Sequence, residues 1–426
     1  MCVLFRILNM RSLVISKLFD VLTKRPGRLL KKDFYLRVLR IVNSSTSLKK
    51  LPNSSKPRLY FDVTVFSLHD NKTGVQRVIR SIFEELKPLL NKRYEIIPVS
   101  CTAITRGFQA LRETKKGSFK LTGYDISPKK GDVFMSLEQA FIEHLAQEEA
   151  FKIMKQRGCR VILAVYDLLP IQLPQCFPKE VESIFEKWLL STSSFAEFLC
   201  DSKTVEKDLV NFLSSKKQKI INSYWFYPGF NFIKKVSSSG ITEIQSSYLE
   251  RLSYFEFNFL LVGTIEPRKG HQIIYDIFSQ LWEKGHSNIS LTFIGKEGWM
   301  VKELIQSLKD SEHYNKNFFW FNDASDGFLD LCYKKTDAVI VASLNEGFGL
   351  PILEAAQRNC RVIANDIPIF REVAPRECYF VDLNNPAHAY QQMQDWLKNP
   401  SKPCSYSRTR TWKDSTLQIL EKTKLL

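Results

Sequence analysis

The 426-residue sequence lacks several features that would place it at once in a class of proteins. Its apolar runs fall far short of the roughly 20 residues that a membrane-spanning helix needs. Its start shows no apolar core with a small-residue cleavage site, so we expect no secretory signal. Its nine cysteines form no C-x-x-C pair and no short Cys/His spacing, which argues against a zinc site and a disulfide framework. We therefore expect a cytoplasmic protein.

Acidic residues are scarce at the start of the chain, where basic residues dominate. The net charge is +16, and residues 1–57 hold 13 Lys or Arg against two acids. This excess predicts an anionic partner, but no nucleic-acid-binding module accompanies it, so we expect no nucleic acid. Apolar side chains alternate with the basic ones, most clearly in Leu29 to Val42. The segment is either a basic amphipathic helix on an anionic membrane or a solvated tail, and the two alternatives weigh equally.

The length favours two domains, and the pattern of apolar runs divides the chain accordingly. After the polar stretch Asn43 to Pro57, short apolar runs alternate with helical or loop material, as in parallel sheets built from βαβ units. The first domain is predicted to span residues 58–236, with a helix over Gly74 to Leu90. Its strands are predicted at Arg58–Phe66, Tyr94–Val99, Asp132–Ser136, Arg160–Tyr166 and Phe195–Cys200.

The alternation is interrupted at Ser237 to Glu243 and then restarts. The second domain is predicted to span residues 244–400, with residues 401–426 forming a helix that returns to the first domain. Helices are expected at about 271–284, 299–309, 326–335 and 351–359. Strands are predicted at Phe257–Gly263, Ile289–Gly295, Phe318–Asn322, Asp337–Ala342, Arg361–Asn365 and Cys378–Val381. Both domains are thus doubly wound α/β sheets, whose ligands bind beyond the carboxyl ends of the strands.

The most informative segment is Ser343 to Gln357, S-L-N-E-G-F-G-L-P-I-L-E-A-A-Q, which follows a predicted strand and enters a helix. Gly347 and Gly349 allow close approach of the backbone to a ligand, and Pro351 suits the first helical position. A helix start of this kind binds anions through backbone amides. The amides concerned are those of Phe348, Gly349 and Leu350.

Two carboxylates flank this loop. Glu346 lies in the loop itself, and Glu354 follows eight residues later, in the predicted first turn of the helix. Carboxylates cannot hold phosphate but accept hydrogen bonds from sugar hydroxyls. Either residue alone is as readily explained by helix-dipole complementation or exposure; together with the glycines and the strand, they indicate a sugar site.

A second segment, Gly263 to Gly270, reads G-T-I-E-P-R-K-G and again joins a predicted strand to a helix. Adjacent Arg268 and Lys269 at the carboxyl end of a strand can neutralise a diphosphate, the arginine as a fork and the lysine as a point charge. An isolated basic pair is usually solvated surface. The flanking glycines and the place of the pair in the alternation favour a phosphate site.

With these motifs in place, the chain resembles glycosyltransferase family 4, the retaining transferases with the GT-B fold of two facing Rossmann-like domains and a cleft between them. The resemblance is strongest from Phe257 to Val381. It rests on E-x7-E (Glu346 to Glu354), P-R-K-G (Pro267 to Gly270) and D-A-S-D (Asp323 to Asp326). More loosely, T-G-V-Q-R at 73–77 and Y-D-L-L-P at 166–170 resemble the family's glycine loop and its H-D-L-x-P element in the first domain.

The resemblance implies a role for each matching residue. Glu346 would contact the hydroxyls of the donor sugar, and Glu354 those of the ribose. Arg268 and Lys269 would neutralise the diphosphate, and Gly74 would let the first domain approach the same phosphate. The other candidates on the donor side share positions at or just after strand ends: Gly263, Thr264, Gly295, Asp323, Gly347, Phe348, Gly349 and Leu350.

Two positions depart from the family pattern. Thr264 stands where many members have arginine, so Arg268 would take over part of that task. Tyr166 replaces the histidine of the H-D pair, which leaves Asp167 as the candidate on the acceptor side.

The resemblance implies a metal-independent, retaining glycosyltransferase that needs no cofactor beyond its nucleotide-sugar donor. No D-x-D pair, the usual metal–diphosphate element of the other transferase fold, occurs in the chain. Fixed cations and helix-end amides would instead stabilise the departing diphosphate. The expected transfer is of a hexose, with mannose from GDP-mannose as first candidate, to a glycan or lipid-linked glycan of a bacterial surface polysaccharide. The protein would work in the cytoplasm or at the inner face of the cell membrane.

Three alternatives remain open. One is a catalytically inactive GT-B scaffold in a glycan assembly complex, and another is a nucleotide-sugar epimerase of the same fold. A dinucleotide-dependent oxidoreductase is less favoured, because no G-x-G-x-x-G with an acid about 20 residues on follows the first strand.

Overall fold

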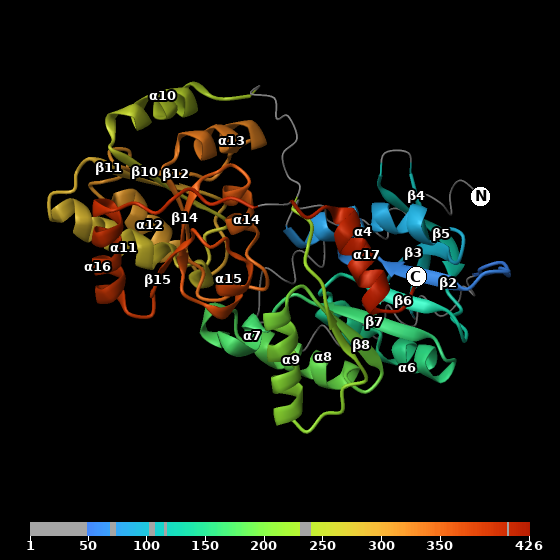
Figure 1. Ribbon diagram of the computed structural model, residues 1–426. Helices are drawn as coiled ribbons and strands as arrows, with labels where there is room; N and C mark the ends of the chain where they lie inside the picture. The colour runs from blue at the N-terminus through green and yellow to red at the C-terminus, as the bar shows by residue number, and fades with distance from the viewer. Residues whose placement is uncertain (1–48, 69–73, 102–106, 115–116, 231–239, 407–408) are drawn as a thin grey trace.

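The computed structural model describes residues 49–426 except 69–73, 102–106, 115–116, 231–239 and 407–408. It has two α/β domains side by side, each around its own sheet (Figure 1). The predicted amphipathic segment Leu29–Val42 lies outside the described residues, as do residues 237–239 at the start of the predicted break between the domains.

The described N-terminal domain is built on a nine-stranded sheet in the order β1-β5-β4-β3-β2-β6-β7-β8-β9. All strand pairs are parallel except β3–β4 and β4–β5. The sheet already begins at residue 49, ahead of the predicted domain boundary. Its strands are β1 (Lys49–Lys50), β2 (Arg58–Asp62), β3 (Glu95–Ser100), β4 (Gln109–Glu113), β5 (Phe119–Asp125), β6 (Val133–Ser136), β7 (Arg160–Val165), β8 (Ala196–Cys200) and β9 (Ser223–Trp225).

The described C-terminal domain has a six-stranded, wholly parallel sheet in the order β12-β11-β10-β13-β14-β15. Every strand lies within one residue of its predicted position at each end. Its strands are β10 (Phe257–Val262), β11 (Ile289–Ile294), β12 (Phe318–Phe321), β13 (Ala338–Val341), β14 (Arg361–Asn365) and β15 (Tyr379–Val381).

Helices cover both faces of each sheet. In the first domain they are α3 (Thr64–Leu68), α4 (Gly74–Leu90), α5 (Phe141–Ala146), α6 (Glu148–Gln156), α7 (Leu169–Gln172), α8 (Val181–Thr192) and α9 (Lys203–Ser215), with η2 (Pro174–Cys176). In the second they are α10 (Glu243–Arg251), α11 (His271–Glu283), α12 (Lys302–Asp310), α13 (Asp326–Lys335), α14 (Leu350–Ala356), α15 (Pro368–Val373) and α16 (Pro386–Lys398), with η3 (Leu252–Tyr254) and η4 (Pro267–Lys269).

Each sheet separates two apolar cores, because successive side chains of a strand point to opposite faces. In β2, Tyr60 joins one core while Leu59 and Phe61 join the other. The final helix, α17 (Trp412–Lys422), lies on the N-terminal domain beside α4 (Figure 1). Its Ile419 and Leu420 are fully buried in the N-terminal core.

One predicted strand is wrong in its second half. The prediction extended it from Arg58 to Phe66, but β2 ends at Asp62 and residues from Thr64 form the short helix α3. The carboxylate of Glu138 explains the change, because it accepts hydrogen bonds from the backbone N–H groups of Val65 (2.6 Å) and Phe66 (2.7 Å). These are donors that a helix start leaves unpaired.

The eight cysteines within the described part of the chain are all buried free thiols. They include Cys159, Cys200 and Cys332. Among the described residues, the helices are too short or too polar to cross a membrane.

Candidate active site

The two predicted loops meet at the carboxyl ends of β10 and β13, which are neighbours in the sheet. Lys269 forms an ion pair with Glu346, and Nη1 of Arg268 lies 3.5 Å from the Glu346 carboxylate. Ser343 Oγ donates a hydrogen bond to the same carboxylate at 2.7 Å. The backbone N–H of Leu344 donates to the carbonyl oxygen of Arg268 at 2.8 Å. The two loops therefore form one unit around Glu346.

Charge balance keeps this unit ionised. Burial by itself would raise the pKa of the Glu346 carboxyl, but Lys269 and Arg268 outweigh it and lower that pKa to about 2. Burial likewise disfavours the charged Arg268 guanidinium, yet Glu346 and Glu266 raise its pKa further. Nε of Arg268 lies 3.0 Å from the Glu266 carboxylate. The site thus holds preformed charges in a largely buried setting, where electrostatic interactions are stronger than in water.

Glycines allow the backbones around this cluster to approach closely. Gly349 and Gly270 have φ values of +93° and +70°, in the region that favours glycine. A side chain on Gly270 would also collide with the carbonyl group of Ala342. A Cβ on Gly295 would meet the carbonyl oxygen of Gly263, so the loops after β10 and β11 touch through backbone alone. Thr264, next to this contact, has an exposed side chain.

Glu354 lies in the second turn of α14, not the first as predicted, because the helix already begins at Leu350. Its carboxylate pairs with Arg77 of α4, in the other domain, at 2.9 Å. It also accepts a hydrogen bond from the hydroxyl of Tyr333 at 3.3 Å. One turn before Arg77, Gly74 approaches Leu350, since a Cβ on Gly74 would lie 3.1 Å from the Leu350 side chain.

Two other predicted residues occupy different surroundings. The side chain of Phe348 is buried and its ring lies 5.8 Å from that of Tyr227, so only its backbone can face a ligand. Asp323 is exposed after β12, and its carbonyl oxygen accepts a hydrogen bond from the Gln245 amide at 3.2 Å.

Asp167, in the N-terminal domain, lies near Arg268 and Glu346 of the C-terminal domain. It follows β7, and its carboxylate accepts a hydrogen bond from the backbone N–H of Leu169 at 3.1 Å. Burial raises its pKa, while the charge of Arg268, across the domain boundary, acts in the opposite direction. The preceding residue, Tyr166, is buried and donates its hydroxyl to the carbonyl oxygen of Leu137 at 2.8 Å. Tyr166 therefore has a structural partner within its own domain.

Sequence analysis missed Asp201, which follows β8 and is only 4% exposed. Burial, reinforced by the nearby charge of Asp167, holds the pKa of its carboxyl well above the usual range. Its Oδ2 faces Gly347, because a Cβ on that glycine would lie 3.1 Å from it. The signal in the sequence was Asp201-Ser202 directly after a predicted strand, at the edge of the sheet where ligands of such domains bind.

Further contacts between the domains were also missed. The carboxylate of Glu372 in α15 accepts hydrogen bonds from the backbone N–H groups of Lys203 (2.9 Å) and Thr204 (2.8 Å), at the start of α9. The indole of Trp299 donates to the carbonyl oxygen of Cys176 at 2.8 Å. These contacts hold the two domains against each other.

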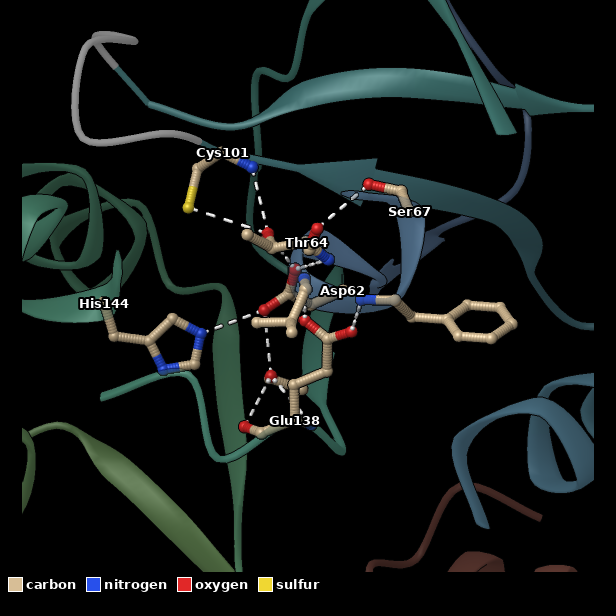
Figure 2. Close-up of polar contacts among 9 residues, drawn as sticks. Asp62, Thr64, Ser67, Cys101, Glu138 and His144 are labelled. Atoms are coloured by element: carbon tan, nitrogen blue, oxygen red, sulfur yellow. Dashed lines mark hydrogen bonds and ion pairs between the residues drawn. The ribbon is translucent and has the colours of Figure 1, made fainter. Parts of the chain in front are cut away.

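Beside the site, the N-terminal domain contains a buried polar cluster (Figure 2). Asp62, at the end of β2, is fully buried; its carboxylate lies 2.9 Å from Nε2 of His144 and accepts a hydrogen bond from Thr64 at 2.6 Å. The Thr64 hydroxyl in turn accepts from the backbone N–H of Cys101 at 3.0 Å. Glu138 completes the cluster, because its carboxylate accepts hydrogen bonds from the backbone N–H groups of Val65 and Phe66 in α3. The cluster fixes the turn that leads from β2 towards Gly74.

Within the described ranges, no group of three or more His, Cys, Asp or Glu side chains is arranged to hold a metal ion.

Comparison with known families identifies the second domain. Residues 256–411 match the family described as Glycosyl transferases group 1, and this range contains the whole Lys269–Glu346 unit. The C-terminal half is a glycosyl transferase group 1 domain. The chain is also 31% identical over 387 residues to the serotype-specific mannosyltransferase WbdA of Escherichia coli, covering 85% of this chain but 46% of WbdA. It thus spans less than half the length of that relative.

A second relative is the O-antigen chain mannosyltransferase RfbU of Salmonella typhimurium, 27% identical over 223 residues, which cover 52% of this chain and 56% of RfbU. The resemblance to transferases of surface-polysaccharide synthesis is confirmed at this level.

Solved structures confirm the two-domain GT-B fold. Sucrose-phosphate synthase from Thermosynechococcus elongatus is similar with a TM-score of 0.57 and 13% identity, over 86% of this chain and 95% of that one. Anabaena HepE, solved with UDP and glucose, is similar with a TM-score of 0.55, the same identity and the same coverage. At this identity the likeness concerns the fold.

Proposed function

We propose that the protein transfers a hexose from a nucleotide diphosphate sugar to a glycan or lipid-linked glycan acceptor, with retention at the sugar carbon. The observation that carries the proposal is the contact of Lys269 and Arg268 with Glu346 at the carboxyl ends of two neighbouring strands. A phosphate cradle and a carboxylate for sugar hydroxyls are thereby adjacent. Mannose is the first candidate for the sugar, because the relatives WbdA and RfbU are mannosyltransferases.

In this proposal, departure of the nucleoside diphosphate is the step that the site assists. Negative charge grows on the diphosphate as the bond to the sugar carbon breaks, and the fixed charges of Lys269 and Arg268 stabilise it without reorganisation. Glu346 orients the sugar hydroxyls, and its low pKa keeps it an acceptor at neutral pH. Glu354 holds the ribose hydroxyls. Two fixed cations can serve the diphosphate in place of a metal ion, so we propose a metal-independent reaction.

The acceptor would enter from the N-terminal domain. Asp167 lies near Arg268 and Glu346, and burial raises the pKa of its carboxyl. We propose that Asp167 contacts the acceptor hydroxyl. The basic segment 1–57 would keep the protein at an anionic inner membrane surface, where a lipid-linked acceptor would be located; vesicle binding that survives removal of residues 1–48 would contradict this part.

Nucleotide binding tests the donor half of the proposal. Thermal unfolding is measured with GDP, UDP, ADP, TDP and CMP, with magnesium and with EDTA, for the wild type, Lys269→Ala and the surface control Lys398→Ala. A ligand at one hundred times its dissociation constant adds about 2.7 kcal/mol of stability. We expect one diphosphate to stabilise the wild type and the control in EDTA but not Lys269→Ala. Equal stabilisation of all three proteins, or of none, contradicts the assignment.

A further inference from the structure

Arg77 and Glu354 connect the two domains at the proposed nucleotide site. Arg77 lies near the start of α4 in the N-terminal domain, and Glu354 belongs to α14 in the C-terminal domain. Nη1 of Arg77 lies 2.9 Å from Oε1 of Glu354, with side-chain exposures of 43% and 17%. The neighbouring contact of Gly74 with Leu350 brings the start of α4 along the start of α14. The pair is therefore part of a continuous contact between these helices.

The two oxygens of Glu354 are held from opposite domains. Oε2 accepts a hydrogen bond from the hydroxyl of Tyr333 at 3.3 Å, and Tyr333 is only 1% exposed in the C-terminal core. Oε1 faces Arg77 of the N-terminal domain. Tyr333 keeps its position when the domains separate, because it lies in the same domain as Glu354. The contact with Arg77 exists only while the domains are closed.

We propose that Arg77 is a positioning residue for the transfer reaction: through Glu354 it couples closure of the N-terminal domain to the occupied ribose site. This rests on the proposed function, in which Glu354 holds the ribose. An ionised carboxylate accepts about four hydrogen bonds, so Glu354 can serve the ribose and Arg77 together. The acceptor side, with Asp167, then closes over the donor when Arg77 reaches Glu354.

Ion pairs at partly exposed positions contribute modestly to stability, so the expected effect is moderate. We expect Arg77→Ala to lower kcat/KM about threefold to fivefold, because the closed arrangement is less populated. Small-angle scattering of the protein saturated with the nucleoside diphosphate that the binding panel identifies should give a larger radius of gyration for Arg77→Ala than for the wild type. Arg77→Lys, which keeps the charge, should recover part of both effects.

A double-mutant cycle with Glu354→Gln shows whether Arg77 acts through Glu354. In the Glu354→Gln background, adding Arg77→Ala should change kcat/KM by less than about 1.5-fold. The control is Arg80→Ala on the same helix, whose guanidinium lies 4.9 Å from the centre of the Phe66 ring; it should match the wild type in kcat/KM and radius of gyration.

The outcomes separate the two proposals. An undiminished loss on adding Arg77→Ala to Glu354→Gln would show that Arg77 acts elsewhere, for example on the diphosphate, and would overturn the inference. Wild-type values for Arg77→Ala would overturn it as well. Both results require a wild type that binds nucleotide and transfers sugar; a wild type that does neither contradicts the proposed function instead, whatever the variants show.

Discussion

The hydroxyl of Ser202 lies 2.9 Å from the carbonyl oxygen of Gly347 and donates a hydrogen bond to it across the domain boundary. The same hydroxyl accepts the backbone N–H of Val205 at 3.1 Å and so caps α9. Gly347 directly follows Glu346, the carboxylate at the centre of the site. The N-terminal domain therefore contacts the backbone of the loop that carries Glu346, and the serine that makes the contact also caps α9.

The absence of a side chain at Gly347 is predicted to be necessary for activity. In Gly347→Ala the added methyl group would meet the carbonyl oxygen of Tyr166, and would lie 2.9 Å from its carbonyl carbon. Because both neighbours are backbone atoms, the domains must separate to make room. We expect kcat to fall at least tenfold, about 1.4 kcal/mol or more, and the radius of gyration to rise.

Asn345→Ala is the control for this prediction. It removes the exposed hydrogen bond from the Asn345 amide to Gln172, 2.8 Å long and also between the domains, and the hydrogen bond that the Asn345 Oδ1 accepts from the backbone N–H of Glu346 at 2.8 Å. We expect kcat within about twofold of the wild type, since each neutral hydrogen bond contributes modestly and the variant adds no atom between the domains. A Gly347→Ala protein with wild-type kcat would show that transfer does not need the closed contact.

Glu372 is predicted to stabilise closure of the two domains. Its carboxylate accepts hydrogen bonds from the backbone N–H groups of Lys203 and Thr204 and from the Thr204 hydroxyl, the last at 2.6 Å. Hydrogen bonds to a charged group contribute about 1.5–3 kcal/mol. Glu372→Ala should therefore increase the radius of gyration and lower kcat/KM about tenfold. Arg371→Ala, which loses an ion pair with Asp366 within the same domain, should leave both quantities unchanged; equal effects of the two variants would contradict the prediction.

The sequence predicted the C-terminal domain closely because each of its strands is a short apolar run buried on both faces and bounded by helical periodicity. The place of the two loops at the carboxyl edge of the sheet could be predicted for the same reason, because Arg268, Lys269 and Glu346 all follow the ends of neighbouring strands. The strand that was predicted wrongly, Arg58 to Phe66, is wrong over one short segment. Thr64 to Phe66 extends the run of β2 in the sequence, but hydrogen bonds to the carboxylates of Asp62 and of the distant Glu138 turn these residues into a helix.

The hairpin of β4 and β5 and the contacts between domains could not be predicted. The hairpin strand Phe119–Asp125 contains Gly123 and exposed residues such as Leu121, so it lacks the apolar run that marked the parallel strands. The partners that Ser202, Glu372 and Arg77 have across the domain boundary are brought to them only when the two domains meet. Such a partner depends on the relative placement of the domains, which the periodicity of one segment does not encode.

His271 is predicted to make stability depend on pH. It is 1% exposed at the start of α11, and burial, reinforced by the charge of Lys269, lowers its pKa to about 3. An unfolded histidine has a pKa of about 6.5, so the unfolded state binds the extra proton first as the pH falls. The stabilisation is complete above pH 6.5 and is lost between pH 6.5 and 3, at about 1.4 kcal/mol per pH unit.

Urea unfolding of the wild type and His271→Leu at pH 7.5 and 5 measures this effect. Leucine cannot titrate, and it is close to histidine in volume. From pH 7.5 to 5 the wild type should lose about 2 kcal/mol more of its unfolding free energy than the variant. Parallel losses in the two proteins would show that His271 takes up its proton equally in the folded and unfolded states.

The most direct measurement of the central claim is sugar transfer itself, assayed by mass spectrometry with GDP-mannose and a synthetic mannoside acceptor carrying a hydrophobic tail. We compare the wild type, Lys269→Ala, Glu346→Gln and the surface control Lys398→Ala in EDTA. The account predicts a product one hexose longer from the wild type and the control. It predicts a loss of at least one-hundredfold in the other two, about 2.7 kcal/mol of transition-state stabilisation. Equal product from all four proteins would contradict the account, as would wild-type conversion of the donor sugar to an epimer without acceptor.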